Sequence, residues 1–77
     1  MKLEKYQMLL SAARNAAPEY QEVFYRRAYL SAEESYGTNS PEVIAVLLAM
    51  NSYLEEKGQC EEALRCQQQA RSIFRGS

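Results

Sequence analysis

Proline and glycine occur at few interior positions of this 77-residue chain, and their placement limits what the chain can fold into. They divide it into four segments at Pro18, at Gly37 with Pro41, and at Gly58. Each segment is rich in Ala, Leu, Glu, Gln, Lys and Arg, which are good helix formers. Apolar residues recur at spacings of three and four rather than alternating, which is helix periodicity. We therefore predict helices over residues 2–16, 18–35, 41–57 and 59–74.

The ends of these segments carry helix-boundary signals. Pro18 and Pro41 suit the first position of a helix, and Ser40 is a good N-cap. Gly37 and Gly58 suit the left-handed residue that follows a helix. The segments 18–35 and 41–57 each carry two apolar stripes, the second one in 41–57 being Ile44, Leu48 and Ala49. A helix with two stripes is expected to touch neighbours on two sides.

Four helices joined by short turns predict an all-α fold of two antiparallel helical hairpins. The hairpins are expected at about residues 2–36 and 41–75, forming one domain over residues 1–75. Residues 76–77 are predicted to be a tail. A chain of this length forms one domain at most and is marginally stable alone.

Composition argues against catalysis. The chain has no His and no Asp, so a Ser-His-Asp arrangement and a His-ligated metal site are excluded. Pairs such as Glu33–Glu34 point about 100° apart on a helix, which does not suit a shared ligand. We predict a non-enzyme without cofactor or metal.

The longest apolar run covers residues 43–50, far short of the ~20 residues that span a bilayer. Glu4 and Lys5 interrupt the apolar stretch that a signal peptide needs. We therefore expect no membrane association and a cytoplasmic location. Cys60 and Cys66 would lie about 9 Å apart along one helix, too far for a disulfide, so we expect both to be reduced and chemically passive.

A block over residues 25–70 carries landmarks of a known repeat. Tyr25 and Ala28 are followed by a Tyr-Gly exit, a Pro-Glu-Val start, an apolar helix, the Gly58 turn and a Glu-Glu-Ala helix that ends at Ala70. Ala28 and Ala70 are 42 residues apart. This block resembles a tetratricopeptide repeat of the 42-residue kind found in kinesin light chains. The first hairpin fits less well, with Ala16 at the place of the turn glycine, and is interpreted as degenerate.

The resemblance implies a right-handed stack of hairpins that serves as a scaffold or adaptor for a protein or peptide partner. In that family the first helix of each pair lines a concave groove. Carried over, the groove residues are Leu3, Tyr6, Gln7, Leu10, Ala45, Leu48, Ala49, Ser52 and Glu55. Their apolar character favours the apolar face of an amphipathic helix as the ligand.

The resemblance also implies self-association, because two hairpins are fewer than a stable stack normally needs and neither terminal helix resembles a polar cap. We expect a homo-oligomer, most simply a two-fold dimer. The candidate residues are Tyr25, Tyr29, Tyr36, Cys66, Ile73 and Phe74.

Two alternatives remain open at this stage. One is a helical nucleic-acid-associated domain that uses a flank of arginines, namely Arg26, Arg27, Arg65, Arg71 and Arg75. The net charge of −1 and the neighbouring glutamates disfavour it. The other is a purely structural, self-assembling subunit.

Overall fold

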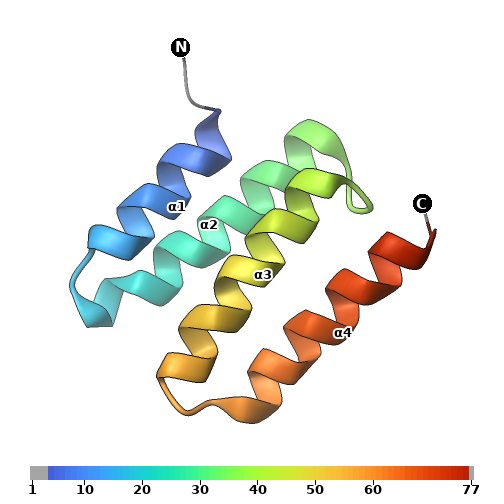
Figure 1. Cartoon of the computed structure of the whole chain (residues 1–77). Coiled ribbons are helices and arrows are strands. Elements are labelled where there is room, and N and C mark those ends of the chain that lie inside the picture. Colours follow the sequence, from blue (N-terminus) through green and yellow to red (C-terminus); the bar gives the residue numbers. More distant parts are fainter. Residues whose placement is uncertain (1–3, 77) are drawn as a thin grey trace.

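The computed structural model describes residues 4–76, which form four helices in sequence (Figure 1). They are α1 (Lys5–Asn15), α2 (Pro18–Tyr36), α3 (Pro41–Glu56) and α4 (Cys60–Gly76). Helix α1 packs along α2, and α3 packs along α4, each pair antiparallel. The prediction of an all-α fold with two helical hairpins is confirmed.

Two helix boundaries differ from the prediction by more than one residue. Helix α1 begins at Lys5 rather than at residue 2, because Glu4 is its N-cap and its backbone N–H donates to Oε1 of Gln7 at 2.9 Å. Gly76, expected in a tail, is the last residue of α4. Both differences concern helix ends, where the sequence signal is weakest.

The predicted caps determine how the two hairpins are connected. Ser40 Oγ accepts a hydrogen bond from the backbone N–H of Val43 at 3.2 Å. Gly37 has φ +92° and Gly58 has φ +79°, both in the left-handed region that disfavours other residues. The turn after α3 is closed by the N–H of Gln59 donating to the carbonyl of Leu54 at 2.9 Å. The turn at residues 37–40 joins the two hairpins, and the turn at Gly58 brings α3 and α4 side by side.

Helix α3 lies at the centre of the core, with α2 on one side and α4 on the other. Its fully buried side chains include Val43 and Val46. One hydrophobic cluster joins α3 to both neighbours; its buried members are Ala28, Ala32, Val43, Val46, Leu47, Ala70 and Ile73. The alanines let the helix backbones approach closely, because a larger side chain would have to be accommodated between them.

Tyrosines link the two hairpins and close the open end of the first. The rings of Tyr25 in α2 and Tyr53 in α3 lie 4.8 Å apart between centroids. Nε2 of Gln69 in α4 donates to the hydroxyl of Tyr29 in α2 at 2.8 Å. The ring of Tyr6 in α1 meets that of Tyr36 edge-on at 5.8 Å. The first two contacts hold the second hairpin against the first.

We predict that Gly58→Val lowers the free energy of unfolding by at least ~1 kcal/mol, because a β-branched residue is strongly disfavoured at positive φ. Chemical denaturation followed by circular dichroism measures the change. The matched control is Gly76→Val at the end of α4, where an added Cβ meets nothing within 4 Å. Equal midpoints for the two variants would show that the α3–α4 turn does not depend on the glycine.

Candidate functional site

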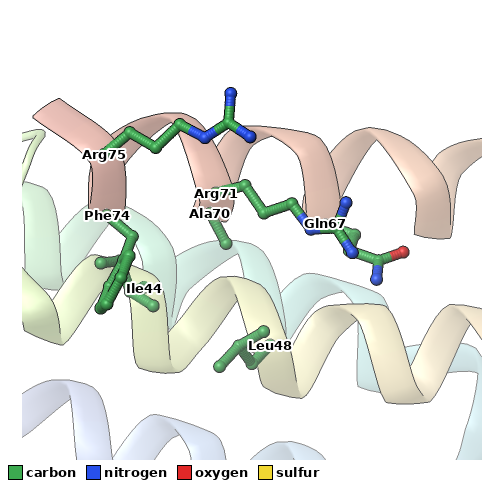
Figure 2. A pocket seen from close by; sticks show the side chains of 7 residues that line it. All are labelled: Ile44, Leu48, Gln67, Ala70, Arg71, Phe74 and Arg75. Carbon is green, nitrogen blue, oxygen red and sulfur yellow. The ribbon is translucent and has the colours of Figure 1, made fainter.

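A hollow opens between α3 and α4 on the side away from the first hairpin (Figure 2). Its volume is about 280 Å³. Helix α3 contributes Ile44 and Leu48, and α4 contributes Gln67, Ala70, Arg71, Phe74 and Arg75. Figure 2 shows Phe74 extending from α4 towards Ile44, with Leu48 farther along α3. The floor of the hollow is therefore apolar and one rim carries two arginines.

A second hollow, of about 520 Å³, continues along the same two helices. It is lined by Asn51, Glu55, Cys60, Ala63, Leu64 and Gln67. Gln67 belongs to both hollows, so together they form one groove, called the α3–α4 groove below. Three large apolar side chains are exposed in it: Leu48 at 49%, Leu64 at 52% and Phe74 at 71%.

Helix periodicity explains the groove. On both α3 and α4, a row of residues at helical spacing lies beside the row that faces the core, and these two rows form the walls. On α3 the wall is Ile44, Leu48, Asn51 and Glu55, at spacings of four, three and four. On α4 it is Cys60, Leu64, Gln67, Arg71 and Phe74, at alternating spacings of four and three. The core stripes of the same helices hold Leu47, Leu54, Ala63 and Ala70.

The α4 residues that line the groove can be compared with the α2 residues 42 positions earlier, which α3 covers. Shifting α2 by 42 residues places Tyr25, Ala28, Tyr29 and Ala32 onto Gln67, Ala70, Arg71 and Phe74. In α2, Ala28 and Ala32 share a buried cluster with residues of α3, and Tyr25 packs on Tyr53 of α3. In α4, the equivalent four residues all line the first hollow. After a shift of 42 residues, the α4 side of the α3–α4 groove thus corresponds to the α2 surface against which α3 packs.

Charge is distributed unevenly along the groove. Arg71 and Arg75 lie at the end formed by the C-terminal part of α4. Glu55 lies at the other end, beside Cys60, and Glu61 is in the first turn of α4. Among the residues that line the groove, the charges are therefore two arginines at one end and Glu55 at the other.

Asn51 lines the second hollow, and the two polar atoms of its side chain differ in their hydrogen bonding. Its Nδ2 donates to Oε1 of Glu55 at 3.2 Å. Its Oδ1 is buried without a hydrogen-bond partner among the described residues. A buried acceptor left in this way costs free energy of folding.

The residues predicted from the sequence to form one groove lie on different surfaces in the structure. Leu3 lies outside the described residues. Tyr6 and Leu10 are half-buried and pack against the core, and Gln7 is exposed and caps α1. Leu48 and Glu55 face α4 and line the α3–α4 groove. Ala45 is exposed and lines neither hollow of that groove.

Ala49 and Ser52 line a separate, more polar hollow of about 270 Å³ together with Arg14, Gln21, Tyr25, Tyr53 and Glu56. A helix such as α3 presents residues to α1, α2 and α4 at once. The sequence pattern did not reveal that Leu48 and Ala49, which are adjacent, serve different surfaces.

The predicted self-association residues are divided in the same way. Tyr25 and Ile73 are only 5% and 6% exposed and belong to the core. Cys66 is half-buried and packs on the core, and Tyr29 is also half-buried. Phe74 lines the α3–α4 groove.

Two tyrosines of that set have shifted pKa values. Burial raises the pKa of Tyr29, although the hydrogen bond from Gln69 acts in the opposite direction. A hydrogen bond to the Glu4 carboxylate raises the pKa of Tyr36 to about 12. The Tyr29 hydroxyl accepts from Gln69 and the Tyr36 hydroxyl donates to Glu4, so both act in contacts within the chain.

Sequence reasoning missed seven lining residues, namely Ile44, Asn51, Cys60, Ala63, Leu64, Gln67 and Ala70. The stripe of Ile44 and Leu48 was visible as a second apolar face, but nothing local showed which helix it would meet. Leu64 and Gln67 follow from the spacing on α4 once the core stripe is known.

The arginines predicted as one flank have different surroundings in the structure. Arg26 pairs with Glu22 one helical turn away at 3.2 Å. Arg71 and Arg75 belong to the groove rim and also line a polar hollow with Gln68 and Ser72.

Within residues 4–76, no helix is both long and apolar enough to cross a membrane, and no cluster of three or more acidic, cysteine or histidine side chains is placed to hold a metal ion. Comparisons with protein-family models, with curated proteins and with solved structures give no match. The groove must therefore be interpreted from its own residues.

We predict that Cys60 is alkylated faster than Cys66 in the folded chain at mildly alkaline pH. Both are free thiols, Cys60 is exposed and Cys66 is half-buried. Burial, aided by the charge of Glu62, raises the pKa of Cys66, so less of it is the reactive thiolate at a given pH. Mass spectrometry after brief iodoacetamide treatment measures the ratio, and denatured protein is the control. Faster labelling of Cys66 would contradict the burial argument.

We also predict that Asn51→Leu stabilises the fold by roughly 1 kcal/mol, because it replaces a buried acceptor without a partner by an apolar group of similar shape. Asn15→Leu is the matched control, since Asn15 is exposed and its Nδ2 donates to the carbonyl of Ser11 at 3.0 Å. Thermal or chemical denaturation compares the two. A loss of stability in Asn51→Leu would indicate that Oδ1 has a partner, such as an ordered water.

Proposed function

We propose that this chain is a non-catalytic protein-interaction module of the helical-repeat type, which binds the apolar face of an amphipathic helix in the α3–α4 groove. The observation that carries the proposal is the repeat equivalence described above. The α4 residues that line the groove are the 42-residue counterparts of the α2 residues that support α3.

The chemistry of the groove supports a helical ligand. Leu48, Leu64 and Phe74 expose apolar surface in a depression whose walls are two helices. Ridges of a third helix fit such a depression, as α3 does against α2. Exposed apolar surface flanked by charged residues is typical of interaction sites.

The same equivalence supports assignment of the chain to the tetratricopeptide repeat family, with a degenerate first hairpin. A role as scaffold or adaptor follows from that assignment. The proposal of a non-enzyme is supported by the absence of His and Asp from the sequence. A cytoplasmic location is supported by the two free thiols in α4.

The test uses a synthetic peptide of residues 40–57, because α3 is the helix that fills the equivalent position in the first hairpin. The labelled protein is held at nanomolar concentration and the peptide is titrated, with binding followed by thermophoresis. We expect saturable binding that Leu48→Glu weakens at least tenfold, since a charge would be buried against the apolar face of the peptide.

The matched control is Leu30→Glu on the outer side of α2. Leu30 is 56% exposed, close to the 49% of Leu48, so the two variants differ in location rather than in chemistry. Equal effects of both variants, or none from Leu48→Glu, would contradict binding in the α3–α4 groove. An unchanged peptide affinity of the Leu48→Glu variant is also the result expected if the peptide displaces the chain's own α3.

A parallel titration with duplex and single-stranded DNA at physiological salt tests the nucleic-acid alternative. Saturable binding that is lost in a double variant with Arg71→Glu and Arg75→Glu would replace the present proposal. We expect only weak, salt-sensitive binding from a chain of net charge −1.

A further inference from the structure

We infer that the α3–α4 groove is covered by a second copy of this chain, related by a two-fold axis, with the two α4 helices antiparallel. This inference rests on the proposed function, because it names the partner of the same groove. It is carried by two features: the groove is self-complementary in charge and also in shape.

The charges along the groove match under a two-fold axis. Arg71 and Arg75 line one end of the groove and Glu55 lines the other, while Glu61 is an exposed residue in the first turn of α4. An axis that passes near the middle of α4 reverses the direction of the second groove. The end of each groove that carries the arginines then lies beside the Glu55 end of the other copy, which favours this pairing over a parallel one.

The shape of the groove matches under the same axis. Gln67, shared by both hollows, lies seven residues from Cys60 and seven from Phe74, or about 10 Å along α4 in each direction. An axis at Gln67 places Phe74 of one copy over the larger hollow of the other, between Cys60 and Leu64. Phe74 is the most exposed large apolar side chain among the described residues, and this hollow measures about 520 Å³.

A head-to-tail arrangement would place α1 of the next copy in the groove, parallel to α3 (Figure 1). Glu4 and Lys5 at the start of α1 would then both lie near Arg71 and Arg75, so the charges give this arrangement no advantage. Such a heterologous contact also leaves both ends of the assembly open, whereas a two-fold contact closes.

Sedimentation of the full chain at tens of micromolar tests the inference. We expect twice the chain mass of 8.8 kDa for the native sequence. A variant with Arg71→Glu and Arg75→Glu should dimerise at least tenfold more weakly, because acidic groups would then face Glu55 and Glu61. A variant with Glu55→Lys and Glu61→Lys should be weakened to a similar degree.

The decisive measurement combines all four substitutions, which restores opposite charges across the axis and should restore the dimer. The matched control carries Arg26→Glu and Arg27→Glu, the same charge change on α2, and should remain dimeric. Circular dichroism checks that each variant keeps its helix content.

Several results would overturn the inference: a monomeric native chain, dimers that Arg71→Glu and Arg75→Glu leave intact, a combined variant that stays monomeric, or a dimer lost in the α2 control. The peptide titration distinguishes failure of the dimer inference from failure of the proposed function. A monomeric chain that still binds the 40–57 peptide through Leu48 loses only the second copy as partner. A chain that is monomeric and binds no peptide loses both.

Discussion

The close crossing of α3 with its two neighbours is the constraint on which the rest of the structure depends. Ala28, Ala32 and Ala70 stand where the helices meet, and all three are buried. Because their side chains are small, Val43, Val46 and Leu47 of α3 can be enclosed from both sides. In a chain of this size the apolar area that these few residues bury is a large part of the driving force for folding.

The same arrangement creates an asymmetry between the two hairpins. The first hairpin has α3 packed against it, whereas the equivalent side of the second hairpin faces outward and carries Leu48, Leu64 and Phe74 at about half exposure or more. The interaction surface proposed for this chain is thus a consequence of how the core is built, with no separate binding loop.

Most of the helix boundaries could be predicted from the sequence, because prolines, glycines and caps act within a few residues of their own position. Pro18, Ser40, Pro41, Gly37 and Gly58 stand where the sequence pattern placed them. The start of α1 was less well defined, since Glu4 as N-cap is a weaker signal than Ser or a following proline. Pairing into hairpins followed from the short turns.

The candidate site was predicted only in part. Leu48, Glu55 and Phe74 were named from the sequence, but for two different surfaces, and the structure brings them into one groove. Tyr25 and Ile73 were expected at a surface and are in the core, because an amphipathic residue such as Tyr gives no local sign of which end will be buried.

The sequence by itself therefore determined the helices, their ends and their apolar stripes, which are set by backbone stereochemistry and side-chain spacing. Only the tertiary structure decided which stripe meets which neighbour. Leu47 and Leu48 show the difference: they are adjacent and alike in chemistry, yet one is 2% exposed against α2 and α4 and the other is 49% exposed in the groove. The physical reason is that a helix rotates about 100° per residue, so the position of the packed neighbours, and not the residue type, selects the buried side.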